Sequence, residues 1–163
     1  MKKAILAMLA CCSAGIATNA AALEDYAGFS VNAAKTSDFG ENNTSAGFTG
    51  LISARPNAYY GYEEQFGLIG KAGPYSLNAE GDFSLAGFLP LGDSGINLYG
   101  KAGADAIFSS GNVFNTGFTY GAGVEYLRGK DAVRLGFQHF NVGKSPSYST
   151  RLIGITFMLK LGE

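Results

Sequence analysis

The sequence predicts an all-β fold, namely an eight-stranded antiparallel up-and-down transmembrane β-barrel. Three observations support this class. Apolar and polar residues alternate with a period of two along several segments of the chain. These segments have about the ten residues that a tilted membrane-spanning strand requires. The 163 residues include 24 glycines, 13% aromatic residues and only 15% charged residues, a composition that suits a single domain of this kind.

The clearest segment is a hairpin over residues 117–140, in which two strands flank the tight turn 128–131. One face of the hairpin is aromatic and aliphatic, and the other combines glycine, hydroxyl, amide and charged side chains. A water-soluble sandwich would bury the apolar face and leave the polar face in water. Small residues mixed with single charges instead suit the crowded inside of a narrow barrel whose outside faces lipid.

The other strands follow from the same alternation. We expect them at 26–35, 46–54, 58–68, 77–89, 96–108 and 151–161. Short connections at 55–57, 90–95 and 128–131 alternate with longer ones at 36–45, 70–75, 109–116 and 142–150. Outer-membrane barrels have short periplasmic turns and longer external loops. We therefore expect a Gram-negative outer-membrane protein with both termini in the periplasm.

The first residues have the features of a cleaved secretory signal. Met1-Lys2-Lys3 precedes a short apolar run, and small residues continue to Ala20-Ala21-Ala22. We assign residues 1–22 to the signal and residues 23–163 to the barrel. A lipoprotein signal ending at Cys11 is the alternative. From Leu23 onward no apolar run is long enough for a membrane-spanning helix, which excludes a helical inner-membrane protein.

Removal of the signal changes the charge and the cysteine content. Loss of Lys2 and Lys3 leaves 10 of the 12 basic residues against 13 acidic ones, a net charge of −3. Both cysteines, Cys11 and Cys12, are lost with the signal. No basic patch indicates a nucleic-acid partner.

Two stretches, residues 83–103 and Tyr120-Gly-Ala-Gly-Val-Glu-Tyr126, resemble the OmpA-like, opacity-type eight-stranded outer-membrane barrels. The resemblance implies a monomer in contact with outer-membrane lipid and lipopolysaccharide, inserted by the barrel-assembly machinery. It also implies a structural or host-contact role, with any host surface ligand bound through the loops. The family usually ends on an aromatic residue, whereas this chain ends Leu161-Gly162-Glu163. That difference concerns assembly efficiency more than the fold.

Six charged residues share the inward parity of the expected strands. An eight-stranded lumen has room for side chains only, so we interpret the six as an ion-pair network that plugs it: Glu63, Asp82, Lys101, Asp105, Glu125 and Arg134. Glu125 and Arg134 should be cross-strand neighbours, because they are symmetric about the 128–131 turn. A metal site or proton relay is the alternative, but mixed charges without ligand spacing disfavour it. We expect no catalytic residue, cofactor-binding residue, metal ligand or cofactor.

Two other functional classes remain open. His139-Phe140-Asn141 is similar to the His-x-Ser pair of lipid A deacylases of the PagL type, which are also eight-stranded barrels. Asn141 replaces the nucleophile and strand 151–161 supplies no acid, so we expect no enzyme, although serines in the 142–150 loop keep this alternative open. A soluble lipocalin-like binder would need an apolar lumen, whereas the inward parity here is polar. Adhesin, serum-resistance factor and purely structural barrel are not distinguished by the sequence.

Overall fold

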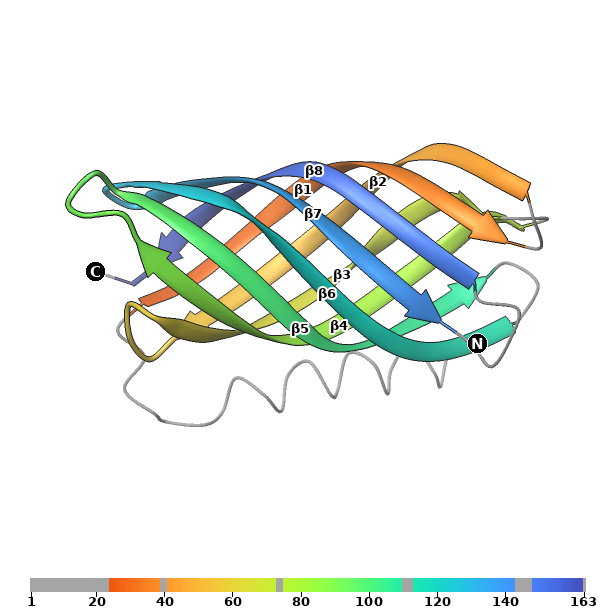
Figure 1. The fold of residues 1–163 in the computed structure, drawn as a ribbon, viewed down its shortest axis with the longest axis horizontal. Coiled ribbons are helices and arrows are strands. Elements are labelled where there is room, and N and C mark those ends of the chain that lie inside the picture. The colour runs from red at the N-terminus through yellow and green to blue at the C-terminus, as the bar shows by residue number, and fades with distance from the viewer. Residues whose placement is uncertain (1–23, 39–40, 73–74, 110–112, 143–147, 163) are drawn as a thin grey trace.

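The computed structural model describes residues 24–38, 41–72, 75–109, 113–142 and 148–162. It contains eight strands, which are β1 (Glu24–Asp38), β2 (Glu41–Arg55), β3 (Tyr60–Ala72), β4 (Tyr75–Pro90), β5 (Ile96–Ser109), β6 (Val113–Arg128), β7 (Asp131–Val142) and β8 (Tyr148–Leu161). Consecutive strands pair in antiparallel fashion, and β1 pairs with β8 to close the barrel (Figure 1). The predicted fold class is confirmed. The predicted signal, residues 1–22, lies outside the described residues.

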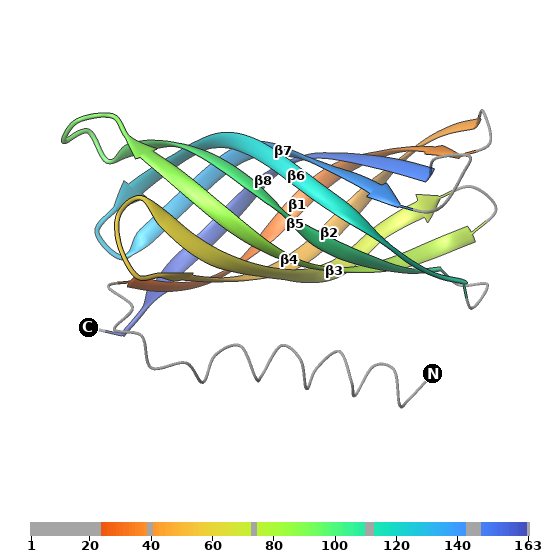
Figure 2. The ribbon, with the colours of Figure 1, turned by 60° about the horizontal axis from the view of Figure 1, so that its bottom comes forward.

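The strands cross the barrel obliquely, as two views of the molecule show (Figure 2). Because side chains alternate between the two faces of a strand, one parity of each strand points into the lumen and the other points outward. All eight strands carry large apolar side chains outward, and the apolar residues exposed on the surface are 39–66% accessible. We call this outward surface the apolar belt. The described residues contain no helix with the length and apolarity needed to cross a membrane.

The strands are longer than the alternation predicted, and the expected long loops are wrong. β1 ends at Asp38 and β2 begins at Glu41, and these two residues are themselves partners in the ladder. Most of the polar segment 36–45 is therefore paired strand, and the segments 70–75, 109–116 and 142–150 are shortened in the same way. The reason is that strand pairing uses backbone groups, so a polar sequence can continue a ladder beyond the apolar belt.

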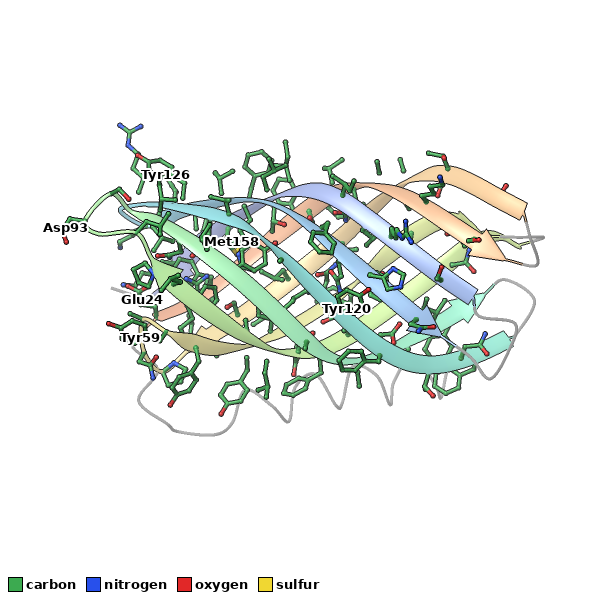
Figure 3. All side chains as sticks on the ribbon, viewed as in Figure 1. Glu24, Tyr59, Asp93, Tyr120, Tyr126 and Met158 are labelled. Carbon is green, nitrogen blue, oxygen red and sulfur yellow. The ribbon has the colours of Figure 1, made fainter. Side chains whose placement is uncertain are left out.

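The connections at 56–59, 91–95 and 129–130 define one end of the barrel, which we call the turn end. Figure 3 shows Glu24, Tyr59, Asp93 and Tyr126 at this end. At the 56–59 turn the Asn57 side-chain oxygen accepts hydrogen bonds from the backbone nitrogens of Tyr59 and Tyr60, at 2.8 and 3.1 Å. Gly129 has a φ of 63°, which glycine adopts without a steric penalty and which the two-residue connection requires.

The first and last strands are also joined at the turn end. The Lys160 ammonium lies 2.8 Å from the Glu24 carboxylate, and both side chains are partly exposed. β1 begins and β8 ends here (Figure 1), so this ion pair connects the two strands whose pairing closes the barrel. The opposite end of the barrel is called the far end below.

Candidate functional site

The lumen near the turn end holds a cluster of two arginines and two glutamates. The Arg55 guanidinium donates to both carboxylate oxygens of Glu125, at 2.8 and 2.6 Å. Arg134 contacts Glu125 through Nε at 2.7 Å and Glu63 through Nη2 at 2.6 Å. All four side chains are buried, with at most 4% accessible. Their charges balance, and we call them the arginine–glutamate cluster.

Arg55 is the member of this cluster that the sequence analysis missed. The sequence places it next to Pro56, in a predicted turn, but it is the last residue of β2 and its side chain is buried. The guanidinium carbon lies 4.5 Å from the centroid of the Tyr26 ring and 4.1 Å from that of Phe88. A planar guanidinium stacks on aromatic rings while its edge binds carboxylates. Arg55 has the same parity as Thr49 and Ser53, which also face inward, and this parity was the signal in the sequence that could have placed it in the lumen.

Tyr99 fills the neighbouring part of the lumen, and its position depends on two glycines. Gly123 and Gly136 face each other across β6 and β7. A Cβ atom on Gly123 would lie 2.8 Å from the Tyr99 ring, and one on Gly136 would collide with the Tyr99 hydroxyl. The Arg134 guanidinium carbon lies 4.6 Å from the centroid of the same ring. The glycines therefore make room for an aromatic ring that occupies the lumen beside the arginine–glutamate cluster.

A second polar layer lies around Lys101. Its ammonium contacts Asp82 at 3.2 Å and Gln65 Oε1 at 3.1 Å. The Gln65 amide donates to Glu80 at 3.1 Å. Gln138 donates to Asp82 and, at 3.0 Å, to the Thr119 hydroxyl. These contacts connect β3, β4, β5, β6 and β7, so the layer crosses the lumen.

Asp105 lies beside this layer without joining it. It is opposite Asp82 in the β4–β5 register and is only 4% exposed. Among the described residues no hydrogen bond reaches either of its carboxylate oxygens and no ion pair includes it. Five of the six charged residues assigned to the lumen from the sequence thus take part in ion pairs or lie in the arginine–glutamate cluster, and Asp105 does not.

The lumen is less polar than the inward parity suggested. Five buried apolar residues from β1, β3, β5, β7 and β8 form one cluster, composed of Ala34, Ile69, Ile107, Phe140 and Leu152. A second cluster consists of Tyr26, Leu51, Ala132 and Met158. Only the charged residues of the inward parity were assigned to the lumen from the sequence, and so the first cluster was not identified. Apolar packing therefore adds to the polar contacts in filling the barrel.

One small cavity lies among these layers in the described part of the chain. A cavity of about 30 Å³ is lined by polar and apolar side chains that include Ser30, Gln65, Tyr99, Lys101 and Arg134. That volume holds only about two or three water molecules. Within the described residues no three histidine, cysteine, aspartate or glutamate side chains are grouped so that they could hold a metal ion.

His139 lies on the outward face of β7, whereas the layers described above lie in the lumen. Its ring centroid is 5.0 Å from that of Tyr120 on β6, and Arg151 faces it on β8. Ser149, which we expected in a loop, belongs to β8 and faces Asn141. Ser149 therefore shares the outward face with His139, diagonally across two strands, but no hydrogen bond between them occurs among the described contacts. The two cross-strand neighbours of His139 are therefore an aromatic residue and a cation, and neither is a carboxylate.

No protein-family model and no curated protein sequence matches the chain. Solved structures do resemble it. Neisserial surface protein A is 16% identical with a TM-score of 0.62, over 84% of this chain and 97% of that one. Ail, the attachment invasion locus protein of Yersinia pestis, is 15% identical with a TM-score of 0.53, over 84% of this chain and 100% of that one. The outer-membrane enzyme PagL is 14% identical with a TM-score of 0.51, over 83% and 98%. These similarities support the barrel fold and do not assign a role.

The arginine–glutamate cluster predicts a coupled effect on stability. Glu125→Ala and Arg134→Ala should each lower the free energy of unfolding by about 3–5 kcal/mol, because each leaves a buried charge without its partner. The double variant should lose less than the sum of the single losses. Urea unfolding in lipid vesicles measures these values. As a control, Glu24→Ala at the partly exposed pair should cost less than about 1 kcal/mol. Additive losses for Glu125 and Arg134 would show that the two are not coupled.

Substitution of Asp105 should change the free energy of unfolding in the opposite direction. Asp105→Asn should leave the free energy of unfolding unchanged or raise it by about 1 kcal/mol, because it removes a buried carboxylate that faces another one. Asp82→Asn, its neighbour across the ladder, should instead lower stability, since Lys101 loses its carboxylate. The same urea titration compares the two variants. A destabilising Asp105→Asn would indicate that its carboxylate has a stabilising partner.

Proposed function

We propose that this protein is a monomeric Gram-negative outer-membrane barrel with a closed lumen, and that it acts as a structural or surface-contact element of the envelope. The observation that carries the proposal is the inverted distribution of polarity. Large apolar side chains are exposed on all eight strands, whereas the charged side chains of the arginine–glutamate cluster are buried inside.

This distribution suits lipid on the outside better than water. A soluble protein rarely exposes contiguous apolar surface beyond a few hundred Å², while a membrane barrel requires an apolar outer band. A soluble lipocalin-like binder needs the reverse arrangement, with a polar outside and an apolar binding cavity. The cavity of about 30 Å³ in this lumen is too small for such a ligand.

The filled cross-section also argues against a channel. Arg55 of β2 and Glu63 of β3 are held from the other side of the barrel by Glu125 of β6 and Arg134 of β7. Opening a passage would break these contacts and leave charges buried without partners. The proposed role therefore lies on the outer surface and at the far end of the barrel.

Surface contact at the far end would be made by strands more than by loops. Only two to five residues separate consecutive strands along the chain at this end, so the paired strand ends themselves form the rim. Ail, whose fold resembles this one, is an attachment invasion locus protein. We propose that any host ligand of this protein binds this rim, and that the turn end and both termini lie in the periplasm, where the barrel-assembly machinery acts.

A lipid A deacylase of the PagL type is the second candidate, because Ser149 shares a face with His139 and PagL has a similar fold. Acyl transfer needs a nucleophile activated by a base that an acid orients. The cross-strand neighbours of His139 are Tyr120 on β6 and Arg151 on β8, and neither is an acid. The proposal is therefore that the protein is not an enzyme.

The first test concerns location. The protein should sediment with outer membranes and migrate differently on gels when it is not heated, because a closed barrel resists unfolding by detergent. Recovery of a folded, water-soluble periplasmic monomer without detergent would refute the proposal.

The second test concerns the lumen. Purified monomer in planar lipid bilayers should show no steady conductance, because the polar layers and apolar clusters fill the lumen. A stable current step of the size of a porin channel would contradict the closed lumen.

The third test concerns chemistry. Lipid A incubated with the purified protein should keep its acyl chains, and His139→Ala and Ser149→Ala should behave as the parent does. Acyl release that both substitutions abolish would make the protein a hydrolase.

A further inference from the structure

Five hydrogen-bond donors form one row on the outward face, on five consecutive strands. Thr44 of β2 faces Lys35 of β1, and Lys35 also faces Arg151 of β8. Arg151 faces His139 of β7, which in turn faces Tyr120 of β6. His139 is half-buried and the other four are exposed. We call these five residues the donor row.

The character of the surface changes at the adjacent row. Two residues nearer the turn end on each strand, the same outward face holds Ala46, Ala33, Ile153, Phe137 and Ala122. All five are apolar. On β1, β2, β7 and β8 the donor row therefore marks the border of the apolar belt, whereas on β6 the exposed Phe118 and Phe114 lie beyond Tyr120. In a membrane such a border meets the lipid headgroups, while the belt meets the acyl chains.

Among the side chains that the structure describes, the two cations in the donor row face each other without a partner of opposite charge. Side chains directly opposite in an antiparallel pair are close, and like charges there destabilise the pair. Neither Lys35 nor Arg151 takes part in the ion pairs of the described residues. Asp25 and Asp131 lie at the turn end, whereas Asp38 of β1 and Glu41 of β2 are three residues from Lys35 and Thr44 and therefore have the opposite parity. An anion from outside the chain, placed between the two cations, would remove the repulsion.

We propose that the donor row binds a phosphate group of a phosphorylated glycolipid in the outer leaflet, with Lys35 and Arg151 as the principal contacts. Phosphate offers only acceptor oxygens, which match a row of donors, and guanidinium binds it through two parallel hydrogen bonds. The apolar residues of the adjacent row would contact the acyl chains of the same lipid. This inference rests on the proposed function, because it needs the far end to face the outer leaflet.

The test uses the folded full-length barrel in zwitterionic detergent, titrated with lipid A and followed by native mass spectrometry. Lys35→Gln/Arg151→Gln should weaken binding at least tenfold. Arg128→Gln/Lys130→Gln, which removes the same charge from the turn end, should change it less than twofold. Arg151→Lys should give an intermediate loss, because it keeps the charge but not the two parallel hydrogen bonds. Heat-dependent gel migration identifies the variants that are folded.

Two further ligands define what the row recognises. Dephosphorylated lipid A and phosphatidylglycerol should each bind the parent at least tenfold more weakly than lipid A. Equal binding of dephosphorylated lipid A would overturn the phosphate contact, and equal binding of phosphatidylglycerol would overturn the choice of glycolipid. Unchanged binding by the Lys35/Arg151 variant, or equal losses in both double variants, would overturn the site. A different result would contradict the proposed function, namely folding of the chain in water without detergent.

Discussion

The structure depends on filling a lumen that eight strands make too narrow for a channel and too wide to leave empty. Glu125 is central to that filling, because it accepts hydrogen bonds from Arg55 on β2 and Arg134 on β7. Arg134 extends the contacts to Glu63 on β3. The arginine–glutamate cluster thus joins β2 and β3 to β6 and β7, which are pairs of strands on different sides of the closed sheet. A balanced set of charges is required there, since an unpaired charge in the lumen is strongly destabilising.

The layer around Lys101 follows a different rule. It contains three carboxylates and one ammonium in or beside it, and much of the contact comes from the amides of Gln65 and Gln138. Amides can donate and accept at once, so they satisfy carboxylates without adding charge. The apolar cluster that includes Ile107 and Phe140 needs no hydrogen-bond or ion-pair partners. The lumen therefore uses ion pairs, amides and apolar packing in successive layers, and together they leave a closed barrel.

If the lumen is closed, as proposed, any activity of this protein lies on the outside of the molecule. In the proposed outer-membrane setting the apolar belt meets lipid, and the donor row offers hydrogen bonds where lipid headgroups would lie. The same residues bear on the proposal that the protein is not a hydrolase, because Arg151, which faces His139, is a cation and supplies no orienting acid. Lipid contact along the strands and partner contact at the rim are compatible with one another, since they use different parts of the outward surface.

The sequence by itself determined the barrel, its eight strands and the partnership of Glu125 with Arg134. Period-two alternation assigns each side chain to a face, and a tight turn places residues symmetric about it opposite each other. It did not determine where the strands end, because pairing is a backbone property and the polar residues after Lys35 continue the ladder. Contacts across the lumen, such as Arg55 with Glu125, were decided only by the tertiary structure. Arg55 and Glu125 are 70 positions apart in the sequence. The distance between them in space depends on closure of the whole sheet, and no local sequence pattern encodes that distance.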